Sequence, residues 1–193
     1  MNILVVDVET NSVNPQRADI LEVGMAMVEL ATGATELLVD TLINPDCPES
    51  EWLHCWFMEH SGINPDEIRQ APKFAAVKEE IQQHLLEYPV TAFNRSYDHQ
   101  VLYRHGVKLP KLWPCLMLTC KDILKLPGFH GDFKYPKFSE AWNWFFPGEY
   151  FNEKHRAGHD VMHEARLAVA LYQGEYFDNA LRCDSSEGVR RGP

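Results

Sequence analysis

The chain has 193 residues, of which 45% are hydrophobic and 24% charged, as expected for one globular domain. Its net charge of −10 argues against a broad cationic surface for nucleic acid, but not against an enzyme that grips a strand end and uses bound metal as its positive charge. The sequence has no apolar run near the roughly 20 residues that span a bilayer and no secretory signal, so we expect a cytoplasmic protein without membrane contact. Its five cysteines form no CxxC pair, so we expect reduced thiols.

Three apolar segments at the start of the chain predict strands joined by short links, over residues 2–9, 20–30 and 35–43. The first segment is apolar on both faces, so we expect it at the centre of a sheet. The remaining elements are strands at 89–93 and 116–119 and helices at 52–59, 72–86, 97–105, 138–146 and 160–172. This order predicts an α/β domain with a mixed five-stranded sheet flanked by helices.

We expect a single domain over residues 1–182 and a polar tail over 183–193. Within the domain, the stretch LPGFHGDFKYPKF at 126–138 predicts a long loop rich in glycine, proline and aromatic residues. Its aromatic side chains alternate with lysines, a pattern that suits stacking of single-stranded bases. Anchoring of an ordinary loop by the same aromatic rings explains the pattern equally well.

The first predicted strand ends in two carboxylates, Asp7 and Glu9, within the sequence ILVVDVET. Side chains on a strand alternate between its faces, so these two acids lie on the same face. They repel each other unless a cation lies between them. For this pair alone, hydrated acids at an exposed strand end are the simpler interpretation.

Two further acids and a histidine follow predicted strands or open predicted helices. Asp98 stands on the first turn of a helix in NRSYD, Asp160 opens the last helix in HRAGHD, and His155 precedes it by five residues. Taken singly, each acid is explained by the preference for carboxylates at a helix start. Taken together, carboxylates from several segments and one base are the parts with which two Mg²⁺ or Mn²⁺ ions cleave a phosphodiester.

These three segments resemble the three motifs of the DEDDh family of 3′–5′ exonucleases, whose fold is ribonuclease H-like. DVET matches the first motif, NRSYD the second and HRAGHD the third, in the family's order. The histidine five residues before the last aspartate is typical of the histidine subfamily rather than the tyrosine one. The resemblance covers residues 1–172 and implies release of nucleoside 5′-monophosphates from DNA or RNA.

The resemblance also implies a role for each residue. Asp7 would bridge two divalent cations, Mg²⁺ or Mn²⁺, and His155 would take the proton of the attacking water. The other expected site residues are Glu9 and Asp160 for the cation beside that water, Asp98 for the second cation, and Thr10, Asn11 and Asn94 for the terminal nucleotide. Many members carry Thr-Gly where this chain has Asn11 and Ser12, which leaves the preference for the terminal sugar or base undetermined.

The implied partner is the 3′ end of a nucleic acid, and the acidity of the chain favours a single strand gripped at its end over long duplex. Relatives include dimers, so a homodimer, a monomer and a subunit recruited to a larger nucleic-acid-processing complex all remain open. Whether the substrate is DNA or RNA depends on contacts to the 2′-hydroxyl that the sequence does not specify.

Three other functions fit parts of the sequence. His155, His159 and His163 recur every four residues and would suit zinc, but they lack the HExxH form and Gly158 interrupts them. A non-catalytic module could use the same fold to bind a nucleic-acid end or a protein, although all the acids needed for catalysis are present. Cleavage inside a strand is a third alternative, but ribonuclease H enzymes lack the histidine–aspartate pair.

Overall fold

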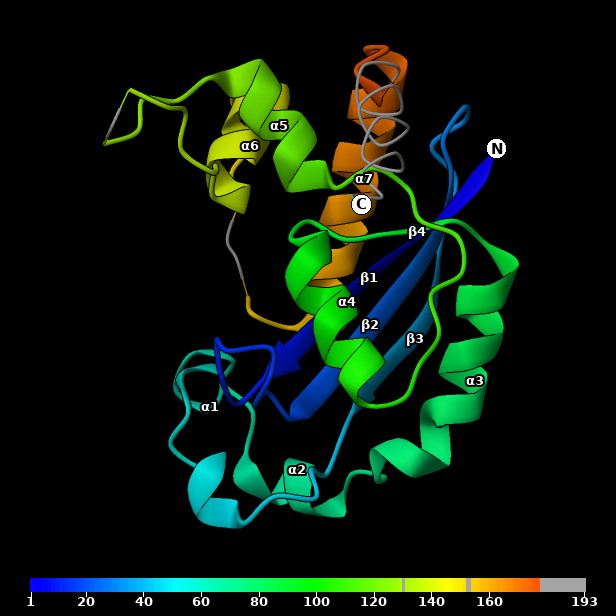
Figure 1. Ribbon diagram of the computed structural model, residues 1–193, viewed down its shortest axis with the longest axis vertical. Helices are drawn as coiled ribbons and strands as arrows, with labels where there is room; N and C mark the ends of the chain where they lie inside the picture. The colour runs from blue at the N-terminus through cyan, green and yellow to red at the C-terminus, as the bar shows by residue number, and fades with distance from the viewer. Residues whose placement is uncertain (130, 152–153, 178–193) are drawn as a thin grey trace, which may run out of the picture.

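The structure is a computed structural model that describes residues 1–129, 131–151 and 154–177 (Figure 1). Its sheet has the strand order β3-β2-β1-β4. The strands are β1 (Asn2–Thr10), β2 (Ile20–Glu29), β3 (Thr35–Leu42) and β4 (Val90–Thr91). β1 pairs antiparallel with β2 and parallel with β4, so the sheet is mixed and β1 lies inside it. The predicted α/β class and the inner position of the first strand are confirmed.

Helices cover both faces of this sheet (Figure 1). They are α1 (Trp56–His60), α2 (Pro65–Gln70), α3 (Phe74–Glu87), α4 (Arg95–Arg104), α5 (Leu116–Leu124), α6 (Phe138–Phe145) and α7 (Ala157–Gln173), with a 3₁₀ turn at Glu49–Glu51. Ile3 and Val5 pack in one buried cluster with α5, α6 and α7, whereas Leu4 and Val6 pack in another with α3 and α4. Alternation along β1 therefore assigns Asp7 and Glu9 to the α7 side.

α7 lies directly on the sheet because β2 carries a glycine beneath its first turn. A Cβ atom on Gly24 would lie 2.3 Å from the backbone carbonyl carbon of Ala157, closer than any side chain permits. Gly24 is also the residue paired with Asp7 across the β1–β2 ladder. Close approach at this point brings the start of α7 next to the acidic end of β1.

Four strands are present where five were predicted. The segment 116–119, predicted as a strand, is the first part of α5, whose residues Leu116, Cys120 and Leu124 are buried at helical spacing. A run of only four residues is compatible with a strand or a helix. The spacing of the buried side chains distinguishes the two only over the longer stretch of α5. The fifth strand's place beside β4 is taken by a single bridge between Val90 and Leu112, in a segment that Pro110 and Pro114 flank.

Other elements differ from the predictions mainly at their ends. α7 begins at Ala157, three residues earlier than predicted, and includes Gly158, which was expected to interrupt it. The predicted helix at 52–59 is replaced by the shorter α1, and α2 was not predicted. The signal for α2 is a capping box in which Asn64 accepts the N–H of Asp66 and Glu67 accepts the N–H of Asn64.

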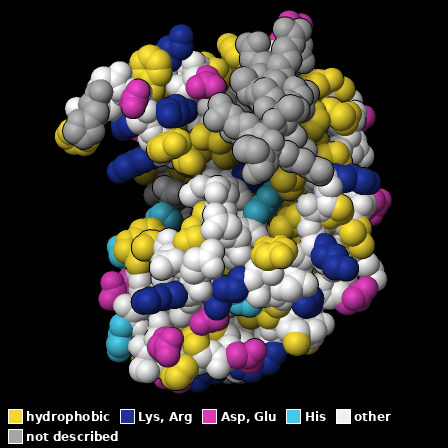
Figure 2. All heavy atoms as spheres, in the orientation of Figure 1, with side chains coloured by type: hydrophobic (Ala, Val, Ile, Leu, Met, Phe, Trp, Pro, Cys, Tyr) yellow, Lys and Arg dark blue, Asp and Glu magenta, His cyan; other side chains and the backbone are white. Residues whose placement is uncertain are grey.

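The segment 116–145, here called the α5–α6 arm, lies at the upper left of Figure 1, and its buried side chains share a cluster with α7 and the sheet. In the same view, Figure 2 shows basic side chains over this arm and a hollow between it and the part of the molecule below. Within the described residues, no helix is long and apolar enough to cross a membrane. The predicted tail at 183–193 lies outside the described residues, as does His130 of the loop at 126–138.

Candidate active site

Two carboxylates lie at the end of β1, on the side that α7 covers. Asp7 is partly buried, and the pKa of its carboxyl is raised well above the ordinary value, first by burial and then by neighbouring negative charge. That negative charge belongs to Glu164, Glu9, Asp98 and Asp160. Four other acids from three segments of the chain therefore converge on Asp7.

Asp98 reaches this site from the first turn of α4. Its side chain is 4% exposed, and its Oδ1 accepts the backbone N–H of Val8 at 3.3 Å. Burial raises the pKa of Asp98 to about 7, although the hydrogen bond from Val8 acts in the opposite direction. Since Val8 stands between Asp7 and Glu9, this hydrogen bond ties the acid of α4 to the acidic end of β1.

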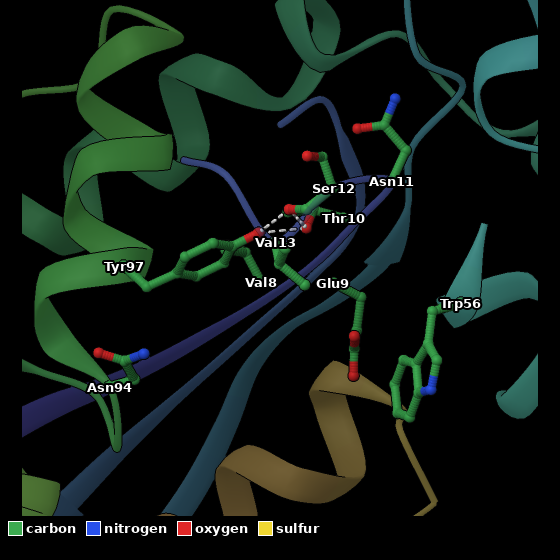
Figure 3. A pocket seen from close by; sticks show the side chains of 9 residues that line it. All are labelled: Val8, Glu9, Thr10, Asn11, Ser12, Val13, Trp56, Asn94 and Tyr97. Atoms are coloured by element: carbon green, nitrogen blue, oxygen red, sulfur yellow. Dashed lines mark hydrogen bonds between the residues drawn. The ribbon is translucent and has the colours of Figure 1, made fainter. Parts of the chain in front are cut away.

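A pocket of about 380 Å³ opens beside Glu9 (Figure 3). Its lining residues are Val8, Glu9, Thr10, Asn11, Ser12, Val13, Trp56, Asn94 and Tyr97. Thr10, Asn11 and Asn94, which were expected to contact the terminal nucleotide, therefore all line this pocket. The Thr10 hydroxyl and the Tyr97 hydroxyl lie 2.5 Å apart, and Tyr97 also donates to the carbonyl of Ser12. The volume is in the range of small-ligand sites and suits one nucleotide.

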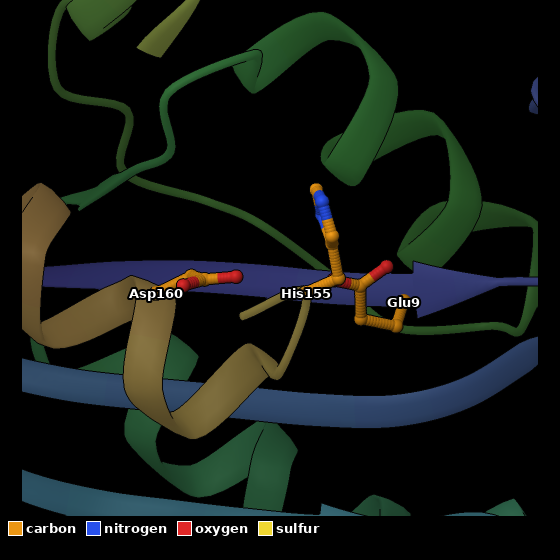
Figure 4. Close-up of side chains that lie close together, drawn as sticks. All are labelled: Glu9, His155 and Asp160. Carbon is orange, nitrogen blue, oxygen red and sulfur yellow. The ribbon is translucent and has the colours of Figure 1, made fainter. Parts of the chain in front are cut away.

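Glu9, His155 and Asp160 meet at the edge of the site (Figure 4). One ligand atom from each lies within 4.8 Å of the other two. Asp160 is 9% exposed; its Oδ2 accepts the backbone N–H of Arg156 at 3.1 Å, and its Oδ1 lies 2.8 Å from Nδ1 of His159. The structure thus brings the base expected from the third motif next to acids of the first and third.

A buried glutamate of β2 anchors the chain just after His155. Glu22 is 1% exposed and accepts hydrogen bonds from Nε of Arg156 at 3.0 Å and from the backbone N–H of Ala157 at 3.0 Å. His155 itself has a φ of 51°, a left-handed conformation that costs a non-glycine residue free energy. The bonds to Glu22 and Asp160 on its C-terminal side hold the backbone in this conformation.

The donor set fits hard divalent cations. Carboxylate oxygens from β1, α4 and α7 are the ligands that Mg²⁺ and Mn²⁺ prefer, and cations between them would relieve the repulsion felt by Asp7. A second group, formed by Asp19, Cys47 and Glu51, also has ligand atoms within 4.8 Å of one another. Burial raises the pKa of the Cys47 thiol to about 12, so it stays protonated and is a poor metal ligand.

Solved structures of nucleases have the same fold. A 3′-exonuclease, in a structure of 3′-end-specific recognition of histone mRNA stem-loop, aligns with a TM-score of 0.69 at 18% identity over 91% of this chain and 83% of that one. The nuclease domain of 3′hExo, a DEDDh family member bound to rAMP, aligns at 0.63 and 16% identity over 90% and 92%. E. coli Exonuclease I with a dT13 oligonucleotide aligns at 0.65 and 17% identity over 92% of this chain and 43% of that one.

A family model described as exonuclease, RNase_T, matches residues 4–172, nearly the whole described chain. The chain belongs to this exonuclease family. No curated protein sequence matches it. The predicted resemblance to the DEDDh exonucleases and the prediction of an exonuclease enzyme are confirmed, and all three motifs that carried them lie inside the matched residues.

The exonuclease site contains one more buried carboxylate that the sequence analysis missed. Glu164 lies on α7 one turn after Asp160, is 6% exposed, and its Oε2 accepts the N–H of Phe93 at 3.0 Å. Among the neighbouring charges, that of Glu164 has the largest effect in raising the pKa of Asp7. Phe93 directly precedes Asn94, so Glu164 links the third-motif helix to the second motif. The available signal was its i+4 spacing from Asp160 on a helix face.

The histidines of the exonuclease do not form the alternative zinc site. Among the described residues, no group of candidate ligands unites His155 with both His159 and His163. The ring of His163 packs against Trp142, with 5.0 Å between centroids, and its Nδ1 lies 3.0 Å from the carbonyl of His159. His159 contacts the carboxylate of Asp160 and so lies beside the acidic site, whereas His155 precedes α7 and is not on the same helix.

Proposed function

We propose that this exonuclease hydrolyses the last phosphodiester at the 3′ end of a single nucleic-acid strand and releases nucleoside 5′-monophosphates. The observation that carries the proposal is the convergence of Asp7, Glu9, Asp98 and Asp160 beside a pocket of nucleotide size. One similar structure concerns an mRNA stem-loop and another holds dT13. This similarity supports a strand end as the substrate and favours neither RNA nor DNA.

The four acids would hold two divalent cations, Mg²⁺ or Mn²⁺, with Asp7 between them. When bound, such a pair stabilises the negative charge that develops on the attacking and leaving oxygens. The protein contributes the fixed positions of the acids, which the hydrogen bonds from Val8 to Asp98 and from Arg156 to Asp160 set before any ligand arrives.

His155 acts in this proposal as the general base. An imidazole ordinarily titrates near neutral pH, so it accepts a proton from the attacking water and returns it to solvent. A ring nitrogen within 4.8 Å of carboxylate oxygens of Glu9 and Asp160 supports this role, because the attacking water would lie beside those two acids. Thr10, Asn11 and Asn94 line the pocket and would hold the terminal nucleotide for in-line attack.

A labelled single-stranded oligonucleotide tests the proposal. With Mn²⁺ or Mg²⁺, the wild-type protein is expected to release mononucleotides stepwise, whereas Asp7→Ala and His155→Ala are expected to release almost none. Metal-independent binding of the oligonucleotide without turnover would instead support the non-catalytic module.

A second substrate, blocked at its 3′ end, separates removal of the last nucleotide from cleavage inside the strand. The exonuclease should stall on it, and release of internal fragments would contradict the proposal. Running matched DNA and RNA strands, single and duplex, in the same experiment measures the substrate preference.

Assembly and location are expectations of the same kind. A homodimer, or recruitment to a larger nucleic-acid-processing complex, stays a prediction that light scattering and co-purification test directly. The cytoplasmic location also stays a prediction, and imaging of the tagged full chain tests it.

A further inference from the structure

α1 brings two aromatic side chains against His155. The Trp56 and His60 rings stack with 4.3 Å between centroids and 15° between planes. The Trp56 ring meets the His155 ring edge to face, at 4.5 Å and 79°. The His60 ring is fixed in turn, because its Nδ1 lies 2.7 Å from the carbonyl of Trp56. The His60 and His155 rings also lie edge to face, with 6.5 Å between centroids and 88° between planes, so the three rings form one cluster at the edge of the acidic site.

The position of Trp56 is unusual for so large an apolar side chain. Trp56 is 53% exposed, although leaving so large an aromatic side chain in water is costly in free energy. It also lines the pocket, where Figure 3 shows its indole beside the carboxylate of Glu9. An exposed tryptophan that contacts both a pocket and a site histidine indicates a functional role rather than core packing.

Different contacts fix the backbone and the ring of His155. Glu22 and Asp160 bind the N–H groups of Ala157 and Arg156, and these bonds act on the main chain beside His155. The edge-to-face contact with Trp56 acts on the ring itself. Such an edge-to-face aromatic contact favours one ring orientation several-fold.

We propose that Trp56, backed by His60, is a positioning residue that holds the imidazole of His155 toward Glu9 and Asp160. The inference rests on the proposed role of His155 as the general base. Without the indole, the imidazole turns away from the carboxylates in a fraction of the molecules, and the proton transfer slows in proportion. His60 contributes by stacking on Trp56 and by its own, longer edge-to-face contact with His155.

Steady-state kinetics on a single-stranded oligonucleotide test the proposal. Trp56→Ala is expected to lower kcat several-fold, by up to about 10-fold, in proportion to the lost population of the productive ring orientation, with KM changed less than about 2-fold. Trp56→Phe keeps an aromatic face and should recover most of the rate, and His60→Ala should show a smaller loss. Tyr150→Ala removes a ring that is 90% exposed outside both the pocket and the α5–α6 arm and serves as the kinetic control. Trp144→Ala, which removes an indole that is 56% exposed on α6, serves as the control for the ring signals of His155.

A double-mutant cycle identifies the residue through which Trp56 acts. In the His155→Ala background, Trp56→Ala should change kcat by less than about 2-fold, because no imidazole remains to be positioned. An undiminished loss in that background, or a rise in KM at constant kcat, would overturn the proposal and make Trp56 a platform for the terminal base. If His155→Ala itself keeps the wild-type rate, the general-base role fails and the positioning role fails with it.

A measurement without substrate or metal covers the case in which His155→Ala is too slow to assay. NMR of protein labelled with ¹⁵N at histidine, with His155 assigned by its absence in His155→Ala, reports the ring directly. Trp56→Ala should shift or broaden the His155 ring signals, because the ring current of the indole disappears, and Trp144→Ala should leave them in place. Unchanged His155 signals in Trp56→Ala would overturn the proposal even if turnover falls.

Discussion

The acidic end of β1 and the loop of the α5–α6 arm are built in opposite ways. Around Asp7, charged groups are buried and held by hydrogen bonds to backbone from distant segments. On the arm, aromatic side chains stand in solvent: Phe129 is fully exposed, and Phe133 and Tyr135 are 45% and 58% exposed. The first region places polar groups where burial is costly, and the second places apolar groups where exposure is costly. The proposed ligands would reverse both costs: cations in the first region and, as a prediction, stacked bases in the second.

Substitution of Asp7 should produce the largest effect at the acidic end. Asp7→Asn keeps the shape but removes the charge proposed to lie between two cations, so we expect kcat to fall roughly 1,000-fold, which corresponds to about 4 kcal/mol. The metal-free variant should be more stable than the wild type, because burial and then the neighbouring negative charges raise the pKa of Asp7 and so disfavour its charged form in the fold. Its Tm should rise by about 2–4 °C for each kcal/mol of repulsion removed.

Calorimetry with and without Mg²⁺ and a nuclease assay check both expectations for Asp7. Asp132→Asn in the exposed loop of the arm is the matched control and should change neither quantity. A metal-free Asp7→Asn protein less stable than the wild type would contradict the view that function, not stability, keeps this acid in place.

The contrast between the two regions also explains which parts were predictable from sequence. Alternation along a strand placed Asp7 and Glu9 on one face without any tertiary information. The order of the three motifs brought in Asp98 and Asp160 through the family resemblance. No local pattern relates Glu164 to Phe93, which is 71 positions away, so that contact was beyond sequence reasoning. The error at 116–119 has the opposite origin, because a run of four residues is too short to distinguish a strand from a helix.

The pH dependence of stability should separate the acidic end from the rest of the fold. In the folded protein the pKa of Asp98 is about 7, against 3.8 for an ordinary aspartate, so between these values the folded state binds more protons than the unfolded one. The free energy of unfolding of the metal-free protein should therefore fall as the pH rises from about 4 to about 7, by at most about 4 kcal/mol from this group.

Thermal unfolding of chelator-treated protein at several pH values measures this slope. Asp98→Asn should flatten it while keeping an oxygen to accept the N–H of Val8. Saturating Mg²⁺ should also flatten it, because bound cations stabilise the charged form. Equal slopes for the wild type and Asp98→Asn would show that other groups dominate the titration.

Glu164 tests whether a carboxylate not among the motif residues belongs functionally to the acidic end. Glu164→Gln keeps an acceptor for the N–H of Phe93 but removes the charge behind Asp7. We expect the Mg²⁺ concentration for half-maximal activity to rise by about 10-fold, as for other outer-shell changes around metals. Glu164→Ala should in addition lose about 1–3 kcal/mol of stability, since the buried N–H is left without this acceptor.

Metal titrations of the rate, combined with urea unfolding, distinguish these two effects of Glu164. Glu80→Gln, an exposed acid on α3 that covers the opposite face of the sheet, provides the control of equal charge change. If the Gln and Ala variants lose stability equally while their Mg²⁺ dependence is unchanged, Glu164 serves the fold alone.

The loop of the arm should give the smallest effect, and one that depends on substrate length. It is closed by hydrogen bonds between Gly128 and Asp132 and between Lys134 and Leu126, and the Nζ of Lys121 lies 4.5 Å from the centre of the Tyr135 ring. These contacts fix the base of the loop and leave its rings exposed. Full exposure of Phe129 means that this ring does not anchor the loop, and stacking of bases on it stays a prediction.

If the arm binds nucleotides upstream of the 3′ end, Phe129→Ala with Tyr135→Ala should raise KM for long strands by about 5- to 10-fold, since each lost stacking contact costs about 1 kcal/mol or more. For a dinucleotide, which is too short to occupy the pocket and the arm together, KM should not change. The Tyr150→Ala variant removes a ring that is 90% exposed outside the arm and serves as the control. An equal rise of KM for dinucleotide and long strand would mean that the rings act on the pocket, and no rise for either would leave the arm without a part in binding single strands. Only a length-dependent KM supports the contrast between a buried site for cations and an exposed surface for bases.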